Sequence, residues 1–203
     1  MTTHLYHDDL PDGLDLGNAV AIDTETMGLN PHRDRLCLVQ LSAGDGNAHL
    51  VKIDVAAQPC PNLTRLWQDA TVTKLFHFAR FDVAVLNHNI GPMAGDLYCT
   101  KIASKLARTY TDRHGLKDLC RELLRVDISK QQQSSDWGAA ELSPEQCEYA
   151  AGDVLYLHAL RDKLTTMLER EERAAEAAAC FAFMQTRAKL DLSGFADLDI
   201  FHH

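Results

Sequence analysis

The sequence predicts an α/β fold in which a mixed central β-sheet is flanked by α-helices. Three short apolar runs come first, separated by Gly, Asn, Asp and Pro, and this pattern is typical of neighbouring strands in a β-meander. Longer stretches follow in which apolar residues recur at helical spacing. Strands that precede helices along the chain favour a mixed sheet whose faces are covered by helices.

The expected elements follow in chain order. After a polar lead-in, strands are expected at 19–23, 36–42 and 49–54, and then helices at 62–68, 79–88, 99–107 and 115–124, with a strand at 73–78 between the first two. The clearest helix start is Ser143, which can cap a helix that has Pro144 in its first turn and Gln146 to complete a capping box. This helix is expected to reach about residue 173. Residues 174–179 could extend it, and 191–203 form a tail that needs a partner surface to be ordered.

Composition limits the classes of protein that the chain can belong to. With 203 residues, 46% of them apolar, and no internal repeat or linker, we expect one domain over residues 1–203. The net charge of -9 argues against extended binding along a duplex, which relies on Lys and Arg, but allows a short substrate. The six cysteines are scattered, as is typical of a protein in a reducing compartment. The N-terminus is polar, and no run of about 18 apolar residues occurs, so we expect a soluble, cytoplasmic protein that binds no membrane.

Two acids stand at the end of the first expected strand. Asp23 and Glu25 are two residues apart and therefore share one face of that strand. At about 4 Å and an effective dielectric of ~20, two carboxylates repel each other by roughly 4 kcal/mol. A positive partner would offset this cost. Alternatively, Glu25 has already left the strand for solvent, or nearby N–H groups satisfy both acids.

Two further segments carry acids in unusual settings. Asp82 falls in the first turns of a helix that follows a strand, where it could be purely structural because a helix N-terminus favours an anion. Tyr149 and Asp153 are four residues apart on the capped helix and share one face, close to Gly152, which indicates close approach of another group. Taken alone, Asp82 decides nothing, and Tyr149 and Asp153 would be read as a helix-surface aromatic and a solvated acid.

Phosphodiester hydrolysis explains why these residues occur together. Two Mg²⁺ or Mn²⁺ ions can clamp the attacking and leaving oxygens, and such hard ions prefer carboxylate oxygens. Four acids balance the charge of two divalent cations. A Tyr hydroxyl one helical turn from a ligand can hold the attacking water without competing for metal.

These residues resemble the three motifs of the DEDDy family of 3′–5′ exonucleases. The motifs are the DTE of residues 23–25, the HxxRFD of 77–82 and the YxxxD of 149–153. SDW at 135–137 and the segment 142–157 are similar to the ribonuclease D catalytic domain. The resemblance implies a ribonuclease H-like, DnaQ-like fold in which Asp23 bridges two cations. It further implies that Glu25 and Asp153 complete one metal site, Asp82 supports the second, and Tyr149 orients the nucleophile.

Over nearly its whole length the chain also resembles the small NrnC-type nano-RNases, as in PHRDRLCLVQLSAGDG and the ending DLDIF. This resemblance implies an oligoribonuclease that cleaves dinucleotides and very short RNA to mononucleotides and assembles as a homo-octamer. The chain departs from ribonuclease D at Ala140, where that enzyme has Arg, and lacks its C-terminal helical RNA-binding domains. Both departures disfavour long structured RNA.

Several side chains are candidates for substrate contact. Leu29 stands where oligoribonucleases carry an apolar wedge between bases, although it could also be an ordinary loop residue. A cap on the 5′ phosphate requires charged or hydroxyl groups, which the cluster at 108–114 and the loop at 130–135 provide, in one subunit or across an interface. The full set of candidates is Thr24, Leu29, His77, Arg108, Arg113, His114, Gln133 and Ser134.

Two other functions are compatible with the same motifs. The chain could be a general 3′–5′ exonuclease that trims longer RNA or DNA, which an open basic groove would support. It could also be an inactive exonuclease fold used to bind nucleic acid. The presence of all four acids and Tyr149 argues against this last function.

Overall fold

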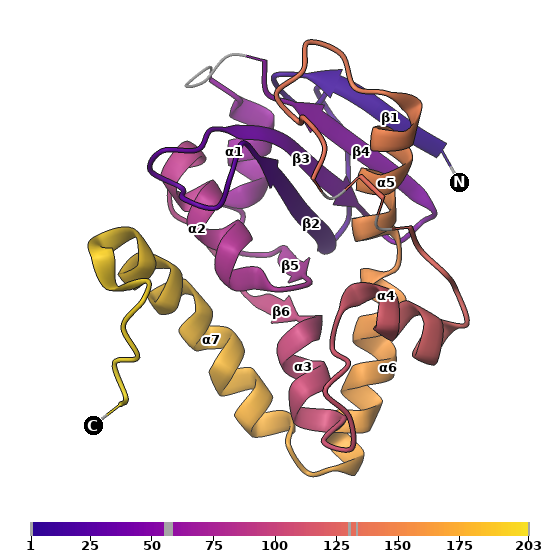
Figure 1. The fold of residues 1–203 in the computed structure, drawn as a ribbon, viewed down its shortest axis with the longest axis vertical. Coiled ribbons are helices and arrows are strands. Elements are labelled where there is room, and N and C mark those ends of the chain that lie inside the picture. The colour runs from indigo at the N-terminus through magenta and orange to yellow at the C-terminus, as the bar shows by residue number, and fades with distance from the viewer. Residues whose placement is uncertain (1, 55–58, 130, 133, 203) are drawn as a thin grey trace.

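The computed structural model describes residues 2–54, 59–129, 131–132 and 134–202. Its centre is a six-stranded sheet with the strand order β1-β4-β3-β2-β5-β6 (Figure 1). β3 pairs antiparallel with β2 and β4, and the remaining neighbours pair parallel, so the predicted mixed sheet is confirmed. The strands are β1 (Thr2–His7), β2 (Ala19–Thr26), β3 (Leu36–Ser42), β4 (Asn47–Lys52), β5 (Thr73–Phe76) and β6 (Leu97–Cys99).

Helices cover both faces of this sheet. They are α1 (Pro61–Trp67), α2 (Ala79–Ile90), α3 (Thr100–Ala107), α4 (Leu116–Leu119) with a π-type turn at Cys120–Leu124, α5 (Pro144–Leu155), α6 (Leu157–Arg170) and α7 (Ala174–Leu190). α5 packs across β3 and β4, whereas α2 packs against β2 and α7 (Figure 1). Among the helices of the described residues, none is both long and apolar enough to cross a membrane.

β2 divides the core into two halves because its side chains alternate between the faces of the sheet. Val20 and Ile22 belong to the apolar cluster on the α1 and α2 side. Ala21 belongs to the opposite cluster, together with α5 and α6. Asp23 and Glu25 continue the Ala21 series and therefore face the side on which α5 lies.

Three expectations about the elements are corrected by the structure. β1 falls in the predicted polar lead-in, because an exposed edge strand carries the polar side chains that sequence patterns assign to loops. β6 precedes α3 and includes Cys99, which we expected to be helical. The single helix expected from Ser143 to about residue 173 is two helices, α5 and α6, separated at Tyr156, and Glu172 in a left-handed conformation precedes α7.

The C-terminal segment is held by the same chain. The Arg80 guanidinium binds both carboxylate oxygens of Asp191, at 2.6 and 2.9 Å, and also donates to the Ala196 carbonyl oxygen at 2.6 Å. Arg187 forms a second ion pair with Asp191. The surface that we expected this tail to need is therefore formed by α2 and α7.

Candidate active site

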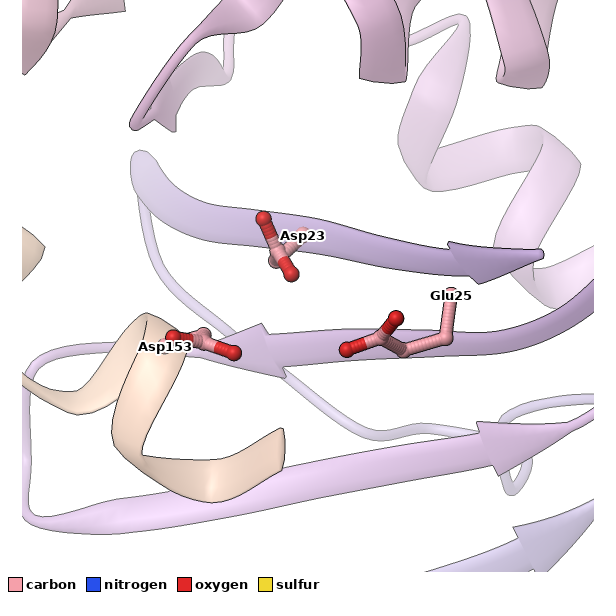
Figure 2. Close-up of side chains that lie close together, drawn as sticks. All are labelled: Asp23, Glu25 and Asp153. Carbon is pink, nitrogen blue, oxygen red and sulfur yellow. The ribbon is translucent and has the colours of Figure 1, made fainter. Parts of the chain in front are cut away.

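Three carboxylates from two elements meet above β2. Oxygen atoms of Asp23, Glu25 and Asp153 all lie within 4.8 Å of one another. Figure 2 shows Asp153 on α5 approaching the two acids of β2. The Ser143 side chain accepts from the Gln146 amide at 3.2 Å, and this predicted capping box fixes where α5 begins and so which of its residues face β2.

The fourth acid joins this cluster from the other side of the sheet. Asp82 is buried in the first turn of α2, and the Thr24 hydroxyl donates a hydrogen bond to its Oδ1 at 2.7 Å. Thr24 lies between Asp23 and Glu25 in β2, so one strand both carries two acids and orients a third. We predicted that Thr24 contacts substrate, but in the structure its hydroxyl donates its hydrogen bond to Asp82.

Burial and mutual repulsion keep these acids from ionising easily. Burial, Asp153 and Asp82 together raise the pKa of Glu25 to about 9. Burial is the main reason that the pKa of Asp82 rises to about 7, and burial and three neighbouring acids hold the pKa of Asp23 well above its usual range. The alternative in which Glu25 has escaped to solvent is excluded by the position of its carboxylate beside those of Asp23 and Asp153, and the cluster needs either protons or cations.

A pH dependence of stability follows from these shifts. An acid with a raised folded-state pKa stabilises the fold below its unfolded pKa and loses this contribution as pH rises through the folded pKa. For Asp82 and Glu25 the loss is therefore expected as pH rises through about 7 and about 9. We expect the melting temperature in EDTA to fall by several degrees between pH 5 and 9, and Mg²⁺ to reverse most of the fall. In a Glu25→Gln variant, the melting temperature in EDTA should change less with pH. Melting temperatures in EDTA that stay constant across this range would contradict the assignment.

Tyr149 completes the constellation one turn before Asp153. Its ring lies against Trp137, with ring centroids 5.9 Å apart. Burial, followed by the charges of Asp153, Glu25 and Asp23, raises the pKa of its phenol. The phenol therefore stays neutral at physiological pH, so it can hold and orient a water molecule but is not itself the base.

The donor set fits hard divalent cations. The three clustered residues offer only carboxylate oxygens, the ligands that Mg²⁺ and Mn²⁺ prefer. Asp82 lies in the same cleft, and its pKa is also raised by Asp153. The repulsion among these four acids is what bound cations would relieve.

The acid cleft, a hollow of about 310 Å³, contains all five predicted catalytic residues. His77 also lines it, as predicted, and its Nδ1 lies 2.9 Å from the Thr100 hydroxyl. Two cationic side chains that the sequence analysis missed, Lys101 and Lys117, line the same cleft. Lys101 could have been found, because it follows a strand that ends at the same edge of the sheet as β5.

Phe78 lies between β5 and α2 with an unusual backbone. Its φ of 81° and ψ of 48° are left-handed, which costs an L-residue other than glycine about 1–2 kcal/mol. The ring lines the acid cleft, and the Lys101 ammonium lies 4.3 Å from its centroid. An exposed cation–π contact of this kind contributes about 0.5–1 kcal/mol, which is less than the strain.

Leu29 lines a second cleft beside the first. The Leu29 side chain is 84% exposed, and this cleft of about 500 Å³ shares Phe78 and Phe81 with the acid cleft. Its other wall is the C-terminal segment, including Gly194 and Asp197. A core-packing role for Leu29 is excluded by this exposure.

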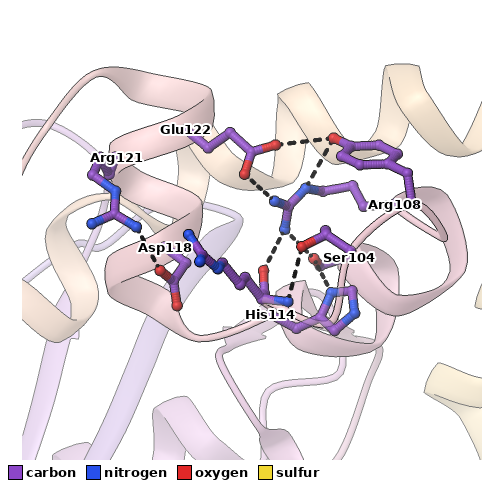
Figure 3. Close-up of polar contacts among 9 residues, drawn as sticks. Ser104, Arg108, His114, Asp118, Arg121 and Glu122 are labelled. Atoms are coloured by element: carbon purple, nitrogen blue, oxygen red, sulfur yellow. Dashed lines mark hydrogen bonds and ion pairs between the residues drawn. The ribbon is translucent and has the colours of Figure 1, made fainter.

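The expected phosphate-binding cluster is organised around a buried arginine. Arg108 is fully buried, and its guanidinium donates to Ser104 at 2.9 Å, to the Arg113 carbonyl oxygen at 2.8 Å and to Glu122 (Figure 3). His114 Nδ1 lies 2.8 Å from the same Ser104 hydroxyl. This placement does not support substrate contact by Arg108, because its hydrogen-bonding groups are used within the chain.

The other candidates are not found in the lining of the acid cleft, as far as the structure describes them. Arg113 and His114 are not among the described residues that line the acid cleft. Ser134 is exposed and does not line it either, and Gln133 falls outside the described residues. Any contact that Arg113, His114 or Ser134 makes with substrate in the same subunit would be outside this cleft.

Arg108→Ala should therefore affect folding rather than binding. Removing the guanidinium leaves Ser104, Glu122 and a carbonyl without their partner, and breaking a buried network of this type costs about 2–4 kcal/mol. We expect a melting temperature lower by about 5–15 °C and an unchanged KM for substrate. Thermal unfolding and steady-state kinetics on the same preparation measure both, with exposed Arg170→Ala as the control. If Arg108→Ala instead raised KM without lowering the melting temperature, Arg108 would contact the substrate after all.

Comparisons with known proteins agree with this geometry. A family model described as 3′–5′ exonuclease matches residues 9–169. Ribonuclease D of Gluconacetobacter diazotrophicus is 35% identical over 156 residues, which cover 76% of this chain and 39% of that protein. The chain thus spans about two fifths of the length of this relative.

Solved structures give matches over the whole chain. The structure of Brucella melitensis NrnC bound to pGG is 57% identical, with a TM-score of 0.96 and coverage of 100% of this chain and 99% of that one. The structure of Brucella melitensis NrnC with bound Mg²⁺ is 56% identical, with a TM-score of 0.95 and full coverage of both chains. Escherichia coli RNase D matches at 27% identity and a TM-score of 0.75, over 85% of this chain and 45% of that one.

Proposed function

Because the chain belongs to the 3′–5′ exonuclease family, we propose that it hydrolyses very short RNA, dinucleotides above all, to nucleoside 5′-monophosphates. The observation that carries the choice of substrate is the 57% identity over the whole chain to an NrnC bound to pGG.

Membership in this family confirms the predicted enzyme class and the predicted fold class. The protein is a hydrolase acting on nucleic acids, related to ribonuclease D and to NrnC. The ribonuclease H-like, DnaQ-like fold class is also confirmed.

In the proposed mechanism, Asp23, Glu25, Asp82 and Asp153 hold two divalent cations, Mg²⁺ or Mn²⁺. Such ions, when bound, stabilise the charge on the attacking and leaving oxygens of the phosphodiester. The Mg²⁺ in the related NrnC structure supports this proposal. The neutral Tyr149 hydroxyl, supported by Trp137, holds the attacking water in line with the phosphorus atom.

Substrate contacts are assigned to groups around the acids. Leu29 separates the two bases, which its high exposure supports, and His77 contacts the substrate inside the acid cleft. Arg113, His114, Ser134 and Gln133 are proposed to cap the 5′ phosphate from a neighbouring subunit. A shared cap requires an oligomer, and the resemblance to NrnC-type enzymes leads us to propose a homo-octamer. Each subunit is proposed to be a single domain over residues 1–203, located in the cytoplasm. Light scattering coupled to size-exclusion chromatography tests the assembly, and a monomer that cleaves dinucleotides would rule out the shared cap.

The similarity to ribonuclease D supports a second candidate, a general exonuclease that trims longer RNA or DNA. A time course on 5′-labelled RNAs of two, three, five and seven nucleotides, with Mg²⁺, Mn²⁺ or EDTA, separates the two functions. Asp153→Ala serves as the inactive control. Fastest cleavage of the dinucleotide, without dinucleotide accumulation from longer strands, is expected. Rates that rise with length would favour the second candidate, and no cleavage at all would indicate a binding module.

A further inference from the structure

Phe78 lies where the acid cleft and the cleft lined by Leu29 meet. Its side chain is 48% exposed. Phe81, in the next turn, packs against the hydrophobic core, whereas Phe78 is not a member of any apolar cluster of the described residues. The ring therefore belongs to the walls of the site rather than to the core.

The backbone at this position does not call for an aromatic side chain. The left-handed turn that leads from β5 into α2 would be adopted by glycine without strain. The cation–π contact with Lys101 stabilises this conformation by less free energy than the left-handed backbone costs. Strained residues of this type cluster at ligand clamps, where the surrounding structure holds a side chain in a required place.

The surroundings of the ring indicate which ligand it suits. Leu29, which is largely exposed, lines one of the clefts that Phe78 lines, so a flat apolar group that enters this cleft finds two apolar side chains in its lining. Lys101 adds a positive charge beside the ring, and the four acids mark where a phosphodiester would be cleaved. A nucleobase attached to that phosphodiester has the required flat shape and π-face.

We propose that Phe78, braced by Lys101, is a stacking platform for one nucleobase of the substrate. The proposal rests on the function proposed above and adds a substrate-binding residue to it. Base stacking lets a dinucleotide gain affinity without the extended basic groove that a long strand would use.

The first experiment compares Phe78→Gly with wild type in steady-state cleavage of a 5′-phosphorylated dinucleotide and in thermal unfolding. We expect kcat/KM to fall about 10- to 100-fold, mainly through KM, while the melting temperature stays the same or rises. That fall corresponds to about 1.4–2.8 kcal/mol at tenfold per 1.4 kcal/mol, within the range of base–aromatic stacking. Phe78→Tyr, which keeps a ring, should recover most of the activity.

Glu172→Gly is the matched control, because Glu172 is also left-handed, with a φ of 54°, but lies in the turn between α6 and α7. Its melting temperature should likewise stay the same or rise, and it should keep the wild-type kcat/KM. If Phe78→Gly does not fold, Phe78→Asn takes its place, since Asn also tolerates this conformation.

A second experiment uses two dinucleotide analogues, each lacking one of the two bases. If the ring stacks on a base, Phe78→Gly and wild type should have the same kcat/KM on the analogue that lacks that base. Equal losses on the intact substrate and on both analogues, or a Phe78→Gly variant with wild-type kcat/KM, would overturn the role of Phe78 while leaving the exonuclease function in place. A wild-type chain that cleaves no RNA would instead overturn both.

Discussion

Asp23→Asn is expected to lower kcat by at least about 10³-fold and, at the same time, to make the metal-free protein more stable. Asn keeps the size of the side chain but removes a negative oxygen from the centre of the acidic cluster. Charge stabilisation by bound cations contributes several kcal/mol to such reactions, and each 1.36 kcal/mol changes the rate tenfold. Cleavage of a dinucleotide at saturating Mg²⁺ measures this loss.

The gain in stability should depend on pH. Because burial and neighbouring acids raise the pKa of Asp23 in the folded chain, this carboxyl destabilises the metal-free fold at alkaline pH and not at acidic pH. The melting temperature of Asp23→Asn in EDTA should therefore exceed that of wild type at pH 8, and the two should converge near pH 4. Exposed Asp162→Asn serves as the control for both measurements. A variant that retains more than about a tenth of the wild-type rate would remove Asp23 from the centre of the mechanism.

Tyr149→Phe is expected to lower kcat about 10²- to 10⁴-fold with KM changed less than about threefold. Positioned groups that manage a proton or hold the attacking water contribute rate factors of this size. Phe keeps the ring against Trp137, so the melting temperature should change by no more than about 2 °C. Single-turnover kinetics and thermal unfolding provide the two measurements.

The Mg²⁺-induced rise in melting temperature distinguishes the role of Tyr149 from metal binding. The rise should be the same in Tyr149→Phe and wild type, because the phenol is not assigned as a ligand. Tyr156→Phe is the matched control, since Tyr156 directly follows α5 but is not among the residues that line the acid cleft. If Tyr149→Phe loses the response to Mg²⁺, the hydroxyl acts through the metals rather than on the water.

Most of the fold could be predicted from local patterns. β3 has the bounds expected from its apolar run, and the capping box at Ser143 marks the start of α5. β1 could not be found in this way, because an edge strand is exposed and its polar sequence resembles a loop. The break at Tyr156 was missed because apolar spacing continues through it from α5 into α6.

For the site, the sequence identified the candidate acids and the faces on which they lie. Asp23 and Glu25 share a strand face, and Tyr149 and Asp153 share a helix face, because side-chain direction follows the period of each element. Both pairs reach one cleft in the structure. Local periodicity therefore determined which side chains share a face, and the resemblance to the exonuclease motifs indicated which of them carry the proposed chemistry.

Only the tertiary structure decided what surrounds those acids. Arg108 was a candidate for phosphate contact, but it is buried and paired with Glu122, fourteen residues away, and such pairing does not follow from local sequence. The left-handed turn of Phe78, the placement of Lys101 over its ring and the C-terminal wall beside Leu29 likewise depend on contacts between distant segments. Sequence periodicity fixes the face of an element on which a side chain lies, whereas the packing of elements against one another decides which side chains it meets.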